Sequence, residues 1–238
     1  MKRILFILTA FLLAIGLSAC TYNPPQGYTE EHHTYEELVE FAKSIDPDAS
    51  VLNEFTDTTI EVWELQFREY PAVINGVECN VSSVGTLVCN DGFAQGAFYR
   101  QYFMIDTDYD YYVLKEIVSK VEPEWKLPEN DVGSVYTWDN SISVYIEADK
   151  TEQLTNEEFE VVWQSISSIY SSYSNLPMRK TILFCLPAPE KTINRGKECV
   201  AKNAYLYINS FSENDKNKYL DRYKEAWKLL ESDLPVYE

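Results

Sequence analysis

Apolar positions recur with a helical period in four segments, each preceded by a Ser or Thr with an acidic residue three positions later. In such capping boxes the two side chains satisfy the first unpaired amides of a helix. The apolar stripes cover residues 38–45, 113–121, 159–173 and 219–230, so we expect four helices that each bury one face. The pairs that precede them are Thr34/Glu37, Thr107/Asp110, Thr155/Glu158 and Ser212/Asp215.

The intervals between these segments have the patterns of β-strands. Residues 141–148 alternate between apolar and polar side chains, whereas residues 181–186 form a continuous apolar run that is typical of a buried central strand. Further strands are expected at 98–105 and 205–208. Asn75-Gly76 separates two apolar runs, and it predicts a tight hairpin because both turn positions need positive φ.

The cysteines suggest disulfide bonds. A second hairpin through Ser83-Val84-Gly85 would place Cys79 opposite Cys89, and Cys185 and Cys199 bracket another short turn-rich segment. Cys20 belongs to the N-terminal leader, so four of the five cysteines remain. An even number in an exported chain favours disulfides. We therefore predict the pairs Cys79–Cys89 and Cys185–Cys199. Free buried thiols are the alternative, and a metal site is disfavoured because no C-x-x-C spacing occurs.

These patterns predict an α+β fold with helices packed on a largely antiparallel sheet. The polar segment 122–140 contains two prolines and is the best candidate linker between an N-terminal half, residues 34–121, and a C-terminal half, residues 141–238. The order of helices, strands and cysteine pairs recurs on both sides, which suggests two similar αββα-type halves. A diverged duplication would explain this, and so would the independent recurrence of capping boxes.

The first 20 residues have the composition of an export leader. Lys2 and Arg3 precede an apolar run, and Leu17-Ser18-Ala19-Cys20 forms a small-residue cleavage site that ends in cysteine. This segment resembles the lipobox of bacterial lipoproteins, and the resemblance covers the leader alone. An uncleaved membrane anchor is the alternative, but the apolar stretch is shorter than the roughly 20 residues that a spanning helix needs.

The lipobox resemblance implies a location and a modification. Residues 1–19 would be a signal peptide, Cys20 would carry diacylglycerol and fatty acids such as palmitate, and residues 20–33 would form a tether. The protein is then expected outside the cytoplasm, anchored by lipid to the bacterial cell membrane, or to the outer membrane in a host with two membranes.

The charge of the chain restricts its partners. Removal of Lys2 and Arg3 with the leader changes the formal net charge from −18 to −20. Nucleic acids and anionic headgroups need a basic surface, so both are disfavoured as ligands. The acidic side chains serve solubility in one interpretation, and in another they favour a cationic ligand, metal or protein partner.

Two groups of residues resemble metal ligands only in part. Asp106, Asp108 and Asp110 have the spacing that opens an EF-hand loop, but Tyr111 and Ile117 replace the required Gly and Glu. Negative charge at a helix start explains them more simply. The adjacent His32 and His33 precede the first helix, and we interpret them as part of a solvated tether. We therefore predict no metal site and no cofactor.

Catalytic motifs give little support for an enzyme. Both histidines would lie outside the folded body, and neither G-x-S-x-G nor a phosphate-binding loop occurs. We assign Trp163, Tyr205 and Trp227 to the core. A tyrosine-rich binding patch could draw on Tyr109, Tyr111, Tyr112, Tyr170 and Tyr173. The sequence therefore favours a non-enzymatic envelope lipoprotein that binds a protein, a glycan or a cationic partner. The alternative is a glycan-active enzyme that works through paired carboxylates.

Overall fold

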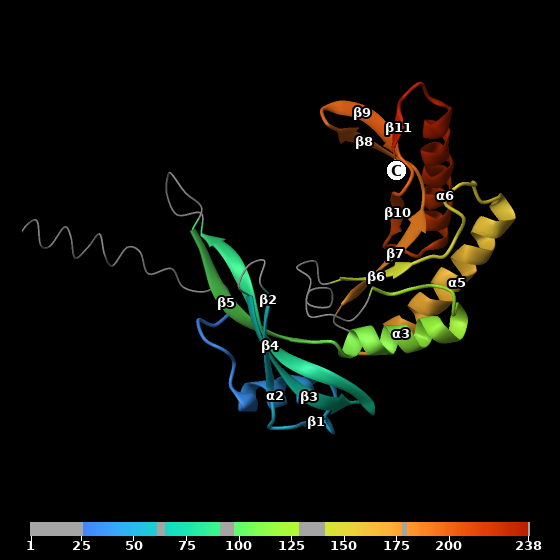
Figure 1. Ribbon diagram of the computed structural model, residues 1–238. Helices are drawn as coiled ribbons and strands as arrows, with labels where there is room; N and C mark the ends of the chain where they lie inside the picture. Colours follow the sequence, from blue (N-terminus) through green and yellow to red (C-terminus); the bar gives the residue numbers. More distant parts are fainter. Residues whose placement is uncertain (1–25, 61–64, 91–97, 129–140, 178–179, 238) are drawn as a thin grey trace, which may run out of the picture.

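The predicted α+β class is confirmed. The computed structural model describes residues 26–60, 65–90, 98–128, 141–177 and 180–237. Within these ranges, largely antiparallel strands form three sheets, which are accompanied by helices (Figure 1). No helix in these ranges has both the length and the apolar sequence to cross a bilayer. The helices are α2 (Tyr35–Ile45), α3 (Tyr109–Val121), α5 (Asn156–Ser174) and α6 (Glu213–Lys228), which continues into a 3₁₀ turn, η1 (Leu229–Glu231).

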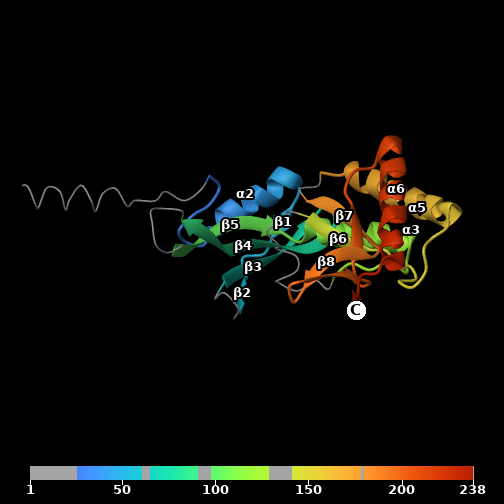
Figure 2. The ribbon, with the colours of Figure 1, turned by 90° about the horizontal axis from the view of Figure 1, so that it is seen from above.

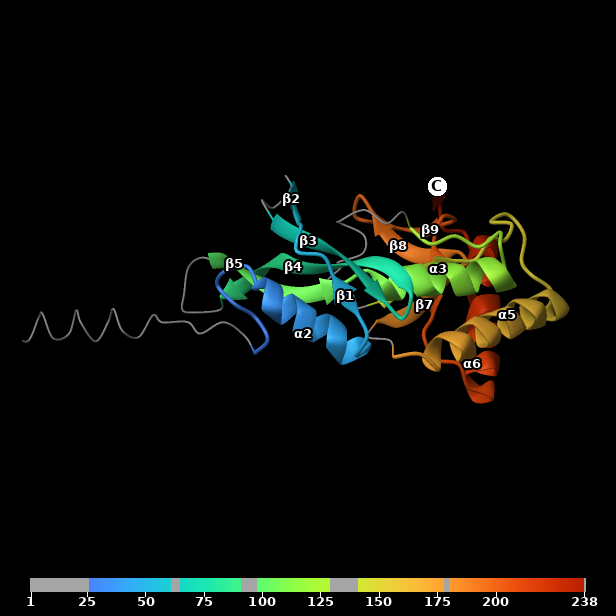
Figure 3. The same ribbon diagram turned by 90° about the horizontal axis from the view of Figure 1, so that it is seen from below.

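The N-terminal half is an antiparallel sheet with one helix across it. Its strands are β1 (Ser50–Val51), β2 (Thr56–Ile60), β3 (Leu65–Ile74), β4 (Val77–Asn90) and β5 (Phe98–Thr107). The order is β1-β3-β4-β5, and β2 also pairs with β3. Helix α2 lies across one face (Figures 2 and 3), where Leu38 and Ala42 pack against buried residues such as Ile74 and Val81.

The C-terminal half combines a three-stranded sheet with a small second sheet. The first sheet has the order β10-β7-β6, and α5 connects its parallel strands β6 and β7. The second has the order β11-β9-β8. Side chains of α5 and α6, including Trp163, Ile166 and Trp227, pack against one face of the first sheet. The strands are β6 (Ser141–Tyr145), β7 (Thr181–Pro187), β8 (Glu190–Asn194), β9 (Lys197–Ala201), β10 (Tyr205–Ile208) and β11 (Val236–Tyr237).

The two halves differ in topology, because the first sheet of the chain is antiparallel throughout and the β10-β7-β6 sheet contains a parallel pair. Helix α3 joins them. Its residues Tyr109 and Val113 belong to the N-terminal core, whereas Leu114 and Val118 belong to the C-terminal core. The predicted domain division remains a prediction, and most of the 122–140 linker lies outside the described residues.

Three of the four predicted capping boxes are confirmed, at α2, α5 and α6. At α3 the prediction is wrong, because Asp108 is the N-cap and makes no side-chain capping bond. Thr107 is still part of β5, and its hydroxyl donates to Asn80 O at 2.7 Å. The Asp110 carboxylate is directed instead to the backbone N–H of Lys180 at 2.6 Å. The Thr107 hydroxyl still accepts locally from Tyr109 N–H at 3.2 Å, but tertiary contacts of Thr107 and Asp110 take the place of the predicted capping box.

The structure corrects both predicted disulfides. Cys79, Cys185 and Cys199 are free, buried thiols. The hairpin at Ser83-Val84-Gly85 does not exist, because β4 continues from Val77 to Asn90. Cys79 and Cys89 are thus ten residues apart on one strand, or roughly 33 Å at the usual rise, whereas a disulfide needs Cα atoms within about 7 Å. The Cys89 side chain lies outside the described residues.

The second predicted pair fails because its cysteines belong to different sheets. Cys185 in β7 lies between Tyr145 of β6 and Tyr207 of β10, and Cys199 in β9 pairs with Thr192 of β8. The other predicted hairpin is confirmed: Ile74 pairs with Val77, and Asn75 and Gly76 have φ values of 49° and 76°.

Candidate functional site

The face of the β10-β7-β6 sheet opposite α5 and α6 carries a group of tyrosines. Alternation along β10 directs Leu206 and Ile208 into the core, so Tyr205 and Tyr207 lie on the opposite face. The strand register aligns Tyr145, Cys185 and Tyr207 across the three strands. We call Tyr145, Tyr205 and Tyr207 the tyrosine cluster.

The tyrosine cluster is partly exposed and rich in hydrogen-bond donors. The ring centroids of Tyr145 and Tyr205 are 5.3 Å apart in an edge-to-face arrangement, and Tyr207 is 51% exposed. Burial raises the pKa of Tyr145 and of Tyr207 above the ordinary value for a phenol, so both hydroxyls stay protonated near neutral pH. Lys150 Nζ donates to the Tyr205 hydroxyl at 3.2 Å and lies 5.4 Å from the centroid of its ring.

A groove with a volume of about 380 Å³ runs beside β10, and we call it the β10 groove. Three separate parts of the chain form it: β10, the start of β8, and the α6 stripe that ends in η1. Leu206, Ala226 and Leu229 contribute apolar surface. The exposed charged residues Glu190, Lys191, Arg222 and Glu225 also line it.

The segment that includes β10 and α6 has a basic composition although the chain as a whole is acidic. Residues 190–228 contain nine basic and six acidic side chains, which leaves eleven basic and 32 acidic side chains for the rest of the chain. Lys191 is paired with Glu198 at 2.8 Å. The Arg222 guanidinium lies 5.5 Å from the centroid of the Tyr219 ring. The lining itself is balanced, with Glu190 and Glu225 beside Lys191 and Arg222.

A second groove, of about 420 Å³, lies between α3 and the segment after it. Tyr111, Lys115, Trp125 and Leu127 are among its lining residues. It is slightly larger than the β10 groove, but its lining comes from the single stretch 111–127. We favour the β10 groove because three elements converge there beside a sheet edge and an exposed aromatic cluster.

The histidines lie on the folded body and not in a free tether, so that prediction is corrected. Thr29 forms a two-bond β-bridge with Phe103, each N–H donating to the other carbonyl at 2.9 Å. His33 N–H donates to Ser83 Oγ at 3.0 Å, and the His32 ring packs 4.1 Å from the Phe103 ring. Burial and the nearby positive charge of Arg68 lower the pKa of His32. The chain is thus fixed to the sheet from about residue 29 onward.

The three aspartates of the D-x-D-x-D motif face different partners. Asp106 pairs with Lys180 Nζ at 2.9 Å, and Asp108 accepts from Asn80 N–H at 2.6 Å. Asp110 accepts from the Lys180 backbone. Among the described residues no three carboxylates are grouped so that they could hold a metal ion. Asp106 and Asp110 connect the end of β5 and the start of α3 to the residue before β7, whereas Asp108 connects to β4.

The tyrosines proposed from the sequence are mostly core residues. Tyr109, Tyr111 and Tyr173 are 1%, 4% and 3% exposed. Tyr112 is partly buried, and Tyr170 stacks on Phe211 with centroids 4.0 Å apart. Tyr205, which we assigned to the core, belongs to the open face instead. The strict alternation of residues 205–208 was the signal for this, since it separates the two tyrosines from Leu206 and Ile208.

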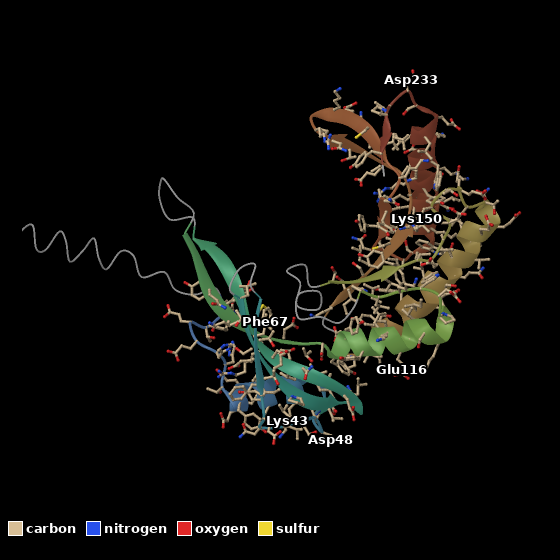
Figure 4. All side chains as sticks on the ribbon, in the orientation of Figure 1. Lys43, Asp48, Phe67, Glu116, Lys150 and Asp233 are labelled. Atoms are coloured by element: carbon tan, nitrogen blue, oxygen red, sulfur yellow. The ribbon has the colours of Figure 1, made fainter. Side chains whose placement is uncertain are left out.

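The candidate site is therefore a binding surface made of the β10 groove, the tyrosine cluster and Lys150. In Figure 4, Lys150 lies in the C-terminal half, whereas Lys43 and Phe67 lie in the N-terminal half. Aromatic rings with protonated hydroxyls beside a groove with charged rims can bind a ligand through stacking and hydrogen bonds. No protein-family model, curated protein or solved structure matches this chain.

Proposed function

We propose that this protein is a lipid-anchored bacterial envelope lipoprotein that binds another macromolecule through the β10 groove and does not act as an enzyme. The observation that carries the proposal is the convergence of three elements on one groove beside half-exposed tyrosines. Interfaces are enriched in Tyr and Arg because these side chains bury large areas and still form polar contacts. Tyr207 and Arg222 provide both residue types at this groove.

The lipid on Cys20 would hold the N-terminal half close to the membrane. Eight residues separate Cys20 from Thr29, which is fixed to β5, and the nine steps between the two residues reach at most about 32 Å. The described chain starts beside the N-terminal sheet, and α6 lies at the other end of the molecule (Figures 1 and 3). The β10 groove would then face away from the bilayer, where a partner can reach it.

Five carboxyl groups lack the property that the enzyme alternative needs. A glycan-cleaving enzyme of the usual kind needs a carboxylic acid with a raised pKa. Hydrogen bonds lower the pKa of these five groups. These groups are Glu37, Asp57, Asp149, Glu158 and Asp215. Turnover of a cell-wall glycan by the purified protein, lost on substitution of one carboxylate, would overturn the binding assignment.

Site-specific crosslinking in the native envelope tests the binding proposal. A benzophenone amino acid in place of Tyr207 should form a discrete covalent adduct with a partner after irradiation. The same amino acid in place of Val161, which is 61% exposed on α5, is the matched control and should form none. Identical adduct patterns at the two positions, or no adduct at Tyr207, would contradict a binding site at this groove.

The anchor is tested separately. Labelled palmitate should enter the protein in a bacterial host, and Cys20→Ser should abolish the label and release the protein from the membrane fraction. Equal labelling of the Cys20→Ser protein would exclude lipidation at this residue.

A further inference from the structure

Strand β10 is the terminal strand of its sheet in the described part of the chain, and there the backbone groups on its outer edge form no hydrogen bond with other described residues. Ala188 N–H donates to Ala204 O at 3.1 Å, which marks those two residues as a hydrogen-bonded antiparallel pair. Such pairs alternate with pairs that exchange no bonds. Leu206 and Ile208 therefore bond to β7, whereas Tyr205 and Tyr207 direct their N–H and C=O groups to the outer edge. Pro187, opposite Tyr205, has no N–H to donate, which agrees with this alternation.

The strand before β10 in the chain, β9 of the second sheet, already has a partner on each side. β11 pairs with β9, where Val200 N–H donates to Pro235 O at 2.8 Å and Lys202 N–H donates to Tyr237 O at 3.3 Å. In the described part of the chain, β7 is the only strand that pairs with β10. The β10 groove runs beside this strand, with α6 as one wall and the start of β8 as another.

The elements that flank the β10 groove limit which kind of ligand can fit into it. A strand added to a sheet lies about 4.8 Å from its neighbour, and a groove flanked by a helix accommodates one extended segment more readily than the sheet of a second folded copy. Side chains of an added strand alternate between the two faces. Those on the core side would meet Leu206, Ala226 and Leu229, which select apolar residues.

The side chains on the open face would meet the tyrosine cluster and Lys150. These groups offer phenol hydroxyls and an ammonium group, which donate hydrogen bonds to carboxylates. At the groove rim Glu190 and Glu225 balance Lys191 and Arg222. Lys150, which contacts Tyr205, adds a positive charge on the open face, so an acidic side chain is favoured there.

We propose that the β10 groove binds an extended peptide segment with alternating apolar and acidic residues, which adds to β10 as a further strand. This inference rests on the proposed binding function and names the ligand class of the same site. Main-chain hydrogen bonds to Tyr205 and Tyr207 hold the segment, and the alternating pockets and charges select it.

Synthetic peptides test this mode directly. Three eight-residue peptides alternate valine with glutamate, lysine or glutamine, and each is titrated against the mature lipidated protein in detergent micelles. The glutamate peptide should bind most tightly and should slow hydrogen–deuterium exchange in residues 204–208. Lys150→Glu should weaken its binding at least about tenfold, whereas Lys43→Glu, the same charge change on α2, should leave it unchanged. A preference for the lysine peptide would overturn the acidic assignment.

Backbone substitutions separate strand addition from side-chain binding. Tyr207→Pro removes an outward N–H that β7 does not use, so it should reduce binding at least about tenfold. Tyr207→Ala keeps this N–H and should reduce binding less. Peptides N-methylated on the edge that faces β10 should fail to bind the unaltered protein, and methylation of the opposite edge should be tolerated. This comparison needs no variant, so misfolding of Tyr207→Pro cannot confuse it.

The outcomes distinguish this proposal from the broader one. Equal binding of both methylated peptides, equal affinity of Tyr207→Pro and the unaltered protein, or binding of no peptide would each reject strand addition. Self-association that Tyr207→Pro abolishes would also reject it and identify a second copy as the occupant. If a crosslink at Tyr207 appears in any of these cases, it supports the proposed binding function while this ligand class is rejected.

Discussion

Removal of one partner from the ion pair between Lys180 and Asp106 should strongly destabilise the protein, because the pair is buried at the junction of the two halves and the other charge would be left unpaired. Lys180 Nζ lies 2.9 Å from Asp106 Oδ2, with side chains 3% and 19% exposed. Lys180→Met retains most of the side-chain volume and leaves Asp106 buried without this cation. Removal of one partner from a buried pair typically costs about 3–5 kcal/mol. The backbone bonds from Lys180 N–H to Asp110 and from the Tyr173 hydroxyl to Lys180 O should persist.

Calorimetry can measure this effect. For a protein of about 200 residues, 1 kcal/mol corresponds to a shift of about 2–4 °C in Tm, so Lys180→Met should lower Tm by about 6–20 °C. Lys120→Met is the matched control, since Lys120 pairs with Glu116 on an exposed helix face with side chains 68% and 60% exposed. Such pairs contribute about 0.5 kcal/mol or less, so its Tm should fall by no more than about 2 °C.

A double-mutant cycle identifies the cause. Asp106→Asn combined with Lys180→Met removes the unpaired charge, so the double variant should be more stable than the sum of the single effects predicts, by about 1–3 kcal/mol. Strict additivity, or equal Tm shifts for Lys180→Met and Lys120→Met, would refute the assignment of a stabilising buried pair at this junction.

Three further predictions concern the N-terminal sheet and the thiols. Gly85→Ala should destabilise the protein by about 1–3 kcal/mol in urea unfolding, because a Cβ there would lie 2.7 Å from the backbone oxygen of Gln66; unchanged stability would contradict this close approach. The pKa of His32 is lowered from 6.5 by burial and by Arg68, so the folded state binds fewer protons at this site. Stability should therefore fall as the pH decreases from about 6.5 through the folded-state pKa, and His32→Asn should reduce the fall in Tm between pH 7.5 and 5. Burial raises the pKa of Cys185 to about 11, so it should react with iodoacetamide at pH 8 only after unfolding, as peptide mapping can show.

Local patterns predicted those elements whose causes lie within a few residues. The capping boxes at Thr34, Thr155 and Ser212 and the Asn75-Gly76 turn depend on neighbouring backbone atoms alone, and all of them form. At Thr107 the same pattern failed because the start of α3 is held by contacts to Asn80 and Lys180, which are distant in sequence.

Gly85 shows why one signal can support a wrong interpretation. A glycine between two apolar runs indicates either a turn or the close approach of another strand. The structure has the second cause, because a Cβ at Gly85 would contact the backbone of Gln66 in β3. The predicted turn also supplied the register that paired Cys79 with Cys89, so one mistaken cause produced two errors. β4 has 14 residues, whereas a typical strand has about 5–6. The usual strand length therefore also favoured a turn within this segment.

The candidate site depends on facts that a local pattern does not contain. The alternation in residues 205–208 separates Tyr205 and Tyr207 from the core residues, but it does not reveal that β10 is at the edge of its sheet or that α6 lies beside that edge. The local excess of basic residues can be counted from the sequence, but the net charge of the whole chain conceals it. A net charge of −18 suggests a basic partner, whereas a count over residues 190–228 gives nine basic and six acidic side chains. Because screening limits electrostatic effects to about 8–10 Å in physiological salt, the charges beside the β10 groove, such as Arg222 and Lys150, matter more for a ligand there than the total charge of the chain does.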